Sequence, residues 1–219
     1  MELKGKKIVF LGDSITEGHG VAGPDKTYWS VLGQRTGALC TADGIGGTRI
    51  AQQQHRLEAT ARHDDNPFFS RVDNLDPDAD IVVVFGGTND YGHGDAAMGN
   101  FEDRTVDTFY GACHDLCLRL LNKYPSAIIV FMTPLHRLQE DTYRNVRANE
   151  VRHLSDFVRA IREVAEYYSL PVLDLFRVAG IQPSIEGQRT LFMPDGLHPN
   201  EAGHQRIADR LIAFLNTLA

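Results

Sequence analysis

Five short apolar runs, spread along the whole chain, most constrain how it can fold. They cover residues 7–11, 38–42, 80–85, 127–132 and 171–175. Within these runs apolar residues mostly follow one another instead of alternating with polar ones, which is typical of strands buried on both faces. We therefore predict five strands of a parallel sheet that is covered by helices on both sides.

Helical patterns separate or follow these runs. Apolar side chains recur at spacings of three and four over residues 103–124, 143–168 and 200–218, the repeat of a helix with one buried face. Alternating strands and helices form right-handed crossover units. We expect an α/β protein with a three-layer α/β/α sandwich. No repeat, low-complexity tract or linker divides the sequence, so we expect a single domain over residues 1–219.

The composition argues against a nucleic acid as the main partner. The chain has 219 residues, a net charge of −7 and no stripe of Lys and Arg, whereas binding to DNA or RNA depends on positive charge. Its three cysteines fit a reducing compartment better than a disulfide scaffold. The apolar stretch near the N-terminus is too short for a signal peptide, and no stretch is long enough for a membrane span. We therefore expect a cytoplasmic protein.

Two short motifs near the ends of the chain supply the groups for acyl transfer. Ser14 lies in Gly12-Asp13-Ser14-Ile15-Thr16, directly after the first apolar run, and Asp195 and His198 lie in Asp195-Gly196-Leu197-His198-Pro199. A serine hydroxyl needs a base to become a nucleophile, and a histidine needs a partner that fixes its tautomer. Structural roles are the alternative: Ser14 or Thr16 as a helix N-cap, and Asp195 as a turn cap before a helix that begins at Pro199.

Two glycine-rich motifs offer hydrogen-bond donors for a developing oxyanion. Gly44-Ile45-Gly46-Gly47-Thr48 and Gly86-Gly87-Thr88-Asn89-Asp90 each follow an apolar run. Gly47 can present a backbone N–H and Asn89 a side-chain amide. Either residue could instead serve only a turn. Ser14, Gly47 and Asn89 all follow predicted strands, so we expect them at the carboxyl edge of the sheet, where α/β proteins bind ligands.

Taken in order, the four motifs resemble those of the SGNH hydrolase superfamily, also called the GDSL-type esterases. The resemblance implies a flavodoxin-like fold with a five-stranded parallel sheet. It implies that Ser14 is the nucleophile, His198 the general base and Asp195 the residue that orients it, with Ser14, Gly47 and Asn89 as oxyanion donors. It also implies small ester substrates and no metal or organic cofactor. One departure is Thr48, because the family often has Asp after this glycine.

The sequence therefore predicts a serine hydrolase that cleaves carboxylic esters through an acyl-enzyme. Polar side chains in residues 91–100 and 133–142 favour a short acyl chain on a polar alcohol, such as an acetylated carbohydrate; they are Tyr91, His93, Asp95, His136 and Arg137. A lysophospholipase or thioesterase for longer acyl chains is the alternative within the family.

Functions other than hydrolysis are also compatible with parts of the sequence. The same sheet edge could belong to a non-catalytic module that binds a small molecule, or to a flavin-binding protein. Cys113, His114 and Cys117 lie close together in the sequence, but a structural zinc needs four well-spaced ligands. Cys113 and Cys117 are four residues apart on the apolar face of a predicted helix, so core packing explains these two cysteines better than a metal site.

Overall fold

The computed structural model describes residues 2–54, 66–141 and 150–218. Its centre is a parallel sheet of five strands in the order β2-β1-β3-β4-β5. The strands are β1 (Lys7–Gly12), β2 (Leu39–Gly44), β3 (Ile81–Phe85), β4 (Ile128–Met132) and β5 (Val172–Leu173). The predicted fold class, a parallel five-stranded sheet between helices, is confirmed.

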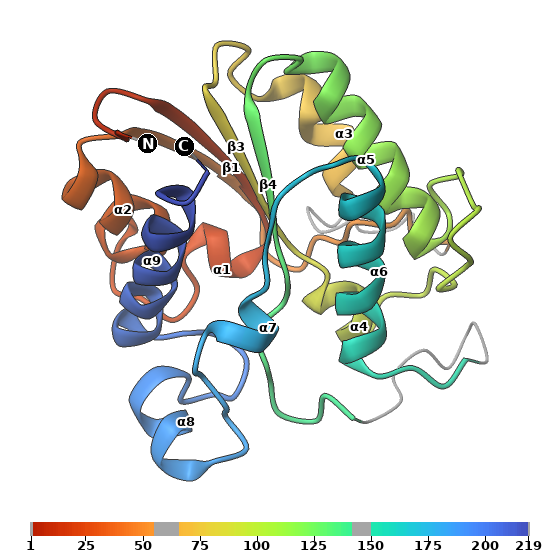
Figure 1. Ribbon diagram of the computed structural model, residues 1–219. Helices are drawn as coiled ribbons and strands as arrows, with labels where there is room; N and C mark the ends of the chain where they lie inside the picture. Colours follow the sequence, from red (N-terminus) through yellow and green to blue (C-terminus); the bar gives the residue numbers. More distant parts are fainter. Residues whose placement is uncertain (1, 55–65, 142–149, 219) are drawn as a thin grey trace.

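Helices cover both faces of the sheet (Figure 1). One face carries α2 (Tyr28–Thr36) and α9 (Glu201–Leu215), and the other carries α3 (Phe68–Arg71), α5 (Phe109–Lys123) and α6 (Leu154–Tyr167). Successive side chains of a strand point to opposite faces. In β3, Val82 and Val84 accordingly join the core under α5 and α6, whereas Ile81 and Val83 join the core under α2 and α9. The continuous apolar runs are explained by these two cores.

Several predicted elements differ in their bounds or burial; the strand expected at residues 171–175, for example, is seen only as Val172–Leu173. β2 lies at the edge of the sheet and is only partly buried, so its less apolar sequence reflects its position. The helix expected at residue 103 begins at Phe109, because Thr108 caps it by accepting from the Gly111 backbone N–H at 3.2 Å. The helix expected from residue 143 is seen as Leu154–Tyr167, and residues 143–149 lie outside the described part of the chain.

The last helix begins one residue later than expected and ends earlier. Asn200 caps α9 by accepting from the Gly203 backbone N–H at 3.1 Å, so Pro199 precedes the helix instead of starting it. No helix in the described ranges combines the length and the apolar character needed to cross a bilayer.

Short helices follow the strands at the carboxyl edge of the sheet. They are α1 (Ser14–Glu17) after β1, α4 (Thr88–His93) after β3 and α7 (Leu175–Val178) after β5, and α7 is followed by α8 (Glu186–Phe192). Gly12 of β1 pairs in register with Gly44 of β2 and with Phe85 of β3. These three strands therefore end at the same level, and the segments that follow them emerge side by side.

Candidate active site

The turn from β1 into α1 presents Ser14. Asp13 is the N-cap of this helix, and its carboxylate accepts from the Ile15 backbone N–H at 3.0 Å. Neither Ser14 nor Thr16 is the cap, contrary to the structural alternative. The turn is tight, because a Cβ at Gly12 would collide with the Thr16 side chain. Ser14 thus becomes the first residue of α1 and lies just beyond the carboxyl end of β1.

Ser14, His198 and Asp195 form a continuous chain of hydrogen bonds. Ser14 Oγ lies 3.1 Å from His198 Nε2, and His198 Nδ1 lies 2.7 Å from Asp195 Oδ2. The other carboxylate oxygen accepts from the backbone N–H groups of Leu197 and His198, at 2.8 and 2.7 Å. Burial acts to raise the pKa of Asp195, but these N–H groups and the imidazole outweigh it and lower that pKa.

The Asp195–His198 loop is held in place by the segment after β4. The Leu138 backbone N–H donates to the Gly196 carbonyl at 2.8 Å. Gly196 has a φ of 77°, and the Leu138 side chain occupies the space that a Cβ there would need. Only glycine satisfies both conditions without strain. Asp195 therefore caps this turn through one carboxylate oxygen and contacts the His198 ring through the other, so the structural and the catalytic interpretation of Asp195 are compatible.

Gly47 and Asn89 lie together on the neighbouring segments. Gly47 has a left-handed backbone with a φ of 78°. Asn89 belongs to the first turn of α4, and its Nδ2 donates to the Thr48 carbonyl at 3.0 Å. The left-handed residue of that turn is Gly87, not Asn89. In the described chain, the backbone N–H groups of Ser14 and Gly47 donate to no protein acceptor. An Asn amide carries two donors, so one Asn89 N–H remains for a ligand.

Asp90 supports the segment that follows Gly47. Its two carboxylate oxygens accept from the backbone N–H groups of Ile50 and Ala51, at 3.0 and 2.9 Å. Burial raises the pKa of Asp90 to about 6, against the opposing effect of these two bonds. Asp90 thus ties α4 to the Gly47 segment.

Arg71 was not anticipated from the sequence, although it contacts three of the segments at the site. It is fully buried on α3, and its Nη2 donates to the Gly12 carbonyl at 2.9 Å and to Thr48 Oγ1 at 3.1 Å. Its Nη1 donates to the Asp43 carbonyl and carboxylate, at 2.9 and 3.1 Å. A single arginine after the residues Phe68, Phe69 and Ser70 gives no sequence signal for this role.

Two further polar side chains flank the hydrogen-bonded chain and were also not anticipated. The ring of His19 lies 5.3 Å from the ring of His198, centroid to centroid. His19 Nε2 lies 3.3 Å from Glu17 Oε2, and both side chains approach Gly46. These residues belong to the segment after the nucleophile motif, where the sequence pattern singles out only Ser14.

The polar residues that were expected to line a pocket mostly bond within the protein. The Tyr91 hydroxyl donates to the Gln139 carbonyl, and the buried Asp95 accepts from the Gln54 backbone N–H at 2.8 Å. His136 lies 2.8 Å from the carboxylate of Glu140. Arg137 Nη1 donates to the Thr88 carbonyl at 3.1 Å, directly beside Asn89. His93 bonds to Asn89 itself. Of the five, Arg137 and His93 therefore come nearest to the candidate site.

The two nearby cysteines and their histidine are part of the core. Cys113 and Cys117 belong to α5 and are buried in the core. The His114 ring bonds to the Phe101 carbonyl at 2.8 Å and the Tyr168 hydroxyl at 3.1 Å. Among the residues that the structure describes, no group of three His, Cys, Asp or Glu side chains is arranged to hold a metal ion.

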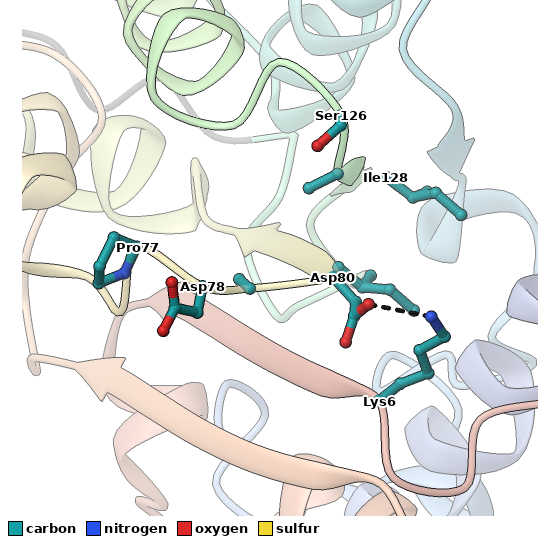
Figure 2. A pocket seen from close by; sticks show the side chains of 9 residues that line it. Lys6, Pro77, Asp78, Asp80, Ser126 and Ile128 are labelled. Atoms are coloured by element: carbon teal, nitrogen blue, oxygen red, sulfur yellow. Dashed lines mark hydrogen bonds and ion pairs between the residues drawn. The ribbon is translucent and has the colours of Figure 1, made fainter.

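A polar hollow of about 440 Å³ lies at the opposite edge of the sheet. Figure 2 shows Lys6 and Asp80 pointing toward each other across it, and their side chains pair at 2.9 Å. Asp80 also accepts from the Lys7 backbone N–H at 2.9 Å. The hollow thus lies next to the amino ends of β1, β3 and β4, whereas Ser14 lies beyond the carboxyl end of β1.

Comparison with known proteins identifies the family of this chain. The profile of the GDSL-like lipase/acylhydrolase family matches residues 10–206. A curated GDSL lipase of Mycobacterium tuberculosis is 25% identical over 211 residues, covering 95% of this chain and 81% of the relative.

Solved structures share the fold over nearly the whole chain. A Lactobacillus plantarum protein is 32% identical with a TM-score of 0.82, and the match covers 98% of both chains. A putative GDSL-like lipase of Bacteroides ovatus is 20% identical with a TM-score of 0.65, covering 98% of this chain and 99% of the other. This chain belongs to the GDSL-like lipase/acylhydrolase family and is an esterase.

Proposed function

We propose that the protein hydrolyses carboxylic esters through an acyl-enzyme on Ser14, with His198 as the base and Asp195 as the residue that orients it. The observation that carries this proposal is the unbroken chain from Ser14 Oγ to His198 Nε2 at 3.1 Å and from His198 Nδ1 to Asp195 at 2.7 Å. Because the Asp195 carboxylate only accepts, Nδ1 carries the proton. Nε2 then has its lone pair free to accept the Ser14 proton.

The reaction follows from this proton placement. Ser14 Oγ attacks the ester carbonyl while His198 Nε2 takes the hydroxyl proton, and a tetrahedral oxyanion forms. The C–O bond to the alcohol then breaks, and His198 returns the proton to the leaving oxygen. A water molecule, deprotonated by His198, attacks the acyl-Ser14 and releases the acid. Ser14 regains its proton from His198.

Three donors would hold the oxyanion in this proposal. They are the backbone N–H groups of Ser14 and Gly47 and the remaining N–H of the Asn89 amide. The Asn89–Thr48 bond links this amide to the residue after Gly47, so the two donors are held relative to each other before a substrate arrives. Fixed donors of this kind stabilise the transition state without reorganisation during the reaction.

For the substrate we propose a short acyl chain on a polar alcohol. The leaving alcohol must lie beside His198, which protonates it; the polar His19 is a neighbour of His198, and Glu17 pairs with His19. A hydroxyl-rich alcohol can replace water on such groups, whereas a long alkyl chain cannot. An acetylated carbohydrate has this chemistry.

The direct test of the mechanism is chemical labelling of Ser14. A serine-reactive phosphonate should modify Ser14, identified by peptide mass spectrometry, and Ser14→Ala should lose both labelling and ester hydrolysis. Ser126 lies exposed in the hollow of the opposite sheet edge (Figure 2), so Ser126→Ala is the matched control and should keep both. Labelling at another residue would remove Ser14 from the mechanism.

The substrate proposal is tested with p-nitrophenyl esters from acetate to palmitate and with acetylated xylan. We expect the acetate and the acetylated xylan to be cleaved best. A preference for long chains would favour a lysophospholipase or thioesterase and leave the serine mechanism intact. No hydrolysis of any ester by a folded protein would favour a binding module.

A further inference from the structure

The Asn89 amide is bonded on both of its ends. Its Nδ2 donates to the Thr48 carbonyl at 3.0 Å, and its Oδ1 lies 3.3 Å from His93 Nε2. Asn89 and His93 are four residues apart on α4, so one helical turn brings their side chains together. His93 in turn contacts Arg49, whose Nη1 lies 2.8 Å from His93 Nδ1.

The direction of each bond follows from what the groups can do. An arginine guanidinium only donates, so His93 Nδ1 accepts from Arg49 and the ring proton lies on Nε2. That N–H then donates to Asn89 Oδ1. Independently, the Thr48 carbonyl only accepts, so the opposite end of the amide must be the nitrogen. The two constraints agree, and both require the same orientation of the Asn89 amide.

We propose that His93, itself oriented by Arg49, is a positioning residue for the Asn89 donor. An amide turned over by 180° would place Oδ1 against the Thr48 carbonyl and Nδ2–H against His93 Nε2–H, losing two hydrogen bonds and creating two repulsive contacts. It would also present an oxygen, in place of an N–H, to the oxyanion. His93 therefore keeps the donor aimed at the developing charge, and this role rests on the proposed function of Asn89.

The loss of this bond is tested with a pair of variants at one position. His93→Phe keeps a ring of similar size without an N–H, and His93→Gln keeps an N–H donor near the position of Nε2. We expect His93→Phe to lower kcat by ~10-fold with little change in KM, less than the 10²–10³-fold typical for loss of a whole oxyanion donor, because the Thr48 bond remains. We expect His93→Gln to recover most of that loss.

A second comparison separates positioning from direct contact with the substrate. His93 is exposed and lies on the same turn as Asn89, so a side chain that touched the alcohol would change KM differently for different esters. A positioning role affects every acetate ester alike, because all share the same oxyanion. The relative loss of kcat in His93→Phe should be equal for p-nitrophenyl acetate and acetylated xylan.

The decisive readout is a double-mutant cycle with Asn89→Ala. If His93 acts through Asn89, adding His93→Phe to Asn89→Ala does not lower kcat any further, because the amide that His93 orients is already absent. Additive losses in the double variant, wild-type kcat in His93→Phe, or no recovery in a folded His93→Gln would each overturn the inference. Asn89→Ala with wild-type kcat would overturn the oxyanion role of Asn89 as well, whereas an impaired Asn89→Ala beside a fully active His93→Phe would overturn the inference alone.

Discussion

The buried guanidinium of Arg71 donates to the carbonyl of Gly12 at 2.9 Å, two residues before Ser14. The same side chain reaches Asp43 at the end of β2 and Thr48 beside Gly47. Carbonyl and carboxylate oxygens at the ends of two neighbouring parallel strands are thereby satisfied by one residue from α3. Arg71 therefore joins the segment of the proposed nucleophile to the segment of a proposed oxyanion donor.

Replacing Arg71 should destabilise the protein strongly. Arg71→Met leaves the Gly12 carbonyl and Thr48 Oγ1 without this buried partner, and each buried polar group left unsatisfied costs about 1–3 kcal/mol. The Asp43 carboxylate also loses this partner, but its side chain is partly exposed and water can solvate it. Arg71→Lys keeps the charge but cannot reproduce the forked donors, so its loss should be intermediate. The free energy of unfolding in urea measures both.

An exposed arginine serves as the control for Arg71. Arg35 pairs with Asp209 at 2.6 Å, with both side chains about half exposed, and such pairs contribute less than about 1 kcal/mol. Arg35→Met should therefore lie within that range. If Arg35→Met and Arg71→Met lowered the free energy of unfolding equally, Arg71 would not stabilise the contact between the segments of Ser14 and Gly47.

Asp195→Asn should inactivate the enzyme without unfolding it. The asparagine oxygen can still accept from the Leu197 and His198 backbone N–H groups, so the turn persists. Its NH₂ would then face His198 Nδ1 and favour the tautomer with the proton on Nε2, which cannot accept from Ser14. In serine hydrolases with this arrangement the wrong tautomer lowers kcat by about 10⁴-fold. Ester hydrolysis and thermal unfolding are measured together, and a loss below tenfold would exclude this role of Asp195.

Asp13 makes the stability of the fold depend on pH in an unusual direction. Burial, with a further contribution from Asp90, raises the pKa of Asp13 from 3.8 to about 7, against the opposing effects of the Ile15 backbone N–H and Arg71. A carboxyl whose pKa is higher in the folded state contributes most stability below its unfolded pKa, and this contribution is lost as the pH rises to about 7.

Asp13→Asn should remove this dependence. Asparagine can keep the N-cap bond to the Ile15 backbone N–H but does not titrate. The free energy of unfolding of the wild type relative to Asp13→Asn should therefore fall between pH 4 and pH 7 and level off above pH 7. Urea unfolding at a series of pH values measures the difference, and parallel curves for the two proteins would show that Asp13 is not the titrating group.

The strands and the four motifs could be predicted because their signals are local. The runs around Ile81–Phe85 and Ile128–Met132 are apolar over their full length, since both faces are buried. Asp195 and His198 are three residues apart, so their contact depends on one turn. Bringing Ser14 next to His198 required only the rule that parallel strands end at one edge and a loop that returns to it.

The supporting residues could not be predicted because their contacts join segments distant in sequence. Arg71 and Gly12 are 59 residues apart, and Arg49 and His93 are 44 apart. No periodicity or spacing relates such pairs. The burial of Tyr91 and Asp95 could not be predicted for the same reason. Both have the polar character of ligand-binding residues, but they bond to Gln139 and Gln54, which are distant from them in the sequence.

Gly44 of β2 lies in close contact with the backbone of α1. A Cβ at Gly44 would lie 2.6 Å from the Thr16 backbone carbonyl carbon and closer still to the Glu17 backbone nitrogen. Backbone atoms cannot move aside as a side chain does, so Gly44→Ala should displace α1. We expect a loss of about 1–3 kcal/mol in stability, as for other overpacked sites, and a lower kcat because Ser14 begins that helix.

Gly187 provides the matched control. It lies in α8 with no atom within 4 Å of the position of a Cβ. Gly187→Ala should raise the free energy of unfolding by about 0.5–1 kcal/mol through helix propensity and leave kcat unchanged. If Gly44→Ala were as harmless as Gly187→Ala in urea unfolding and ester hydrolysis, the close packing of α1 on β2 would not matter for the site.

His19 tests the proposed polar alcohol. Its ring lies 5.3 Å from that of His198, centroid to centroid, and its Nε2 lies 3.3 Å from the Glu17 carboxylate. If His19 bonds a hydroxyl of the alcohol, His19→Ala should raise KM for an acetylated sugar about fivefold, the value of one hydrogen bond of about 1 kcal/mol. The KM for p-nitrophenyl acetate, whose alcohol lacks such hydroxyls, should stay unchanged. Gln205, exposed on α9, gives the control variant Gln205→Ala, with neither KM altered. An equal rise in KM for both esters in His19→Ala would mean that His19 acts on His198 or on the fold, and not on the alcohol.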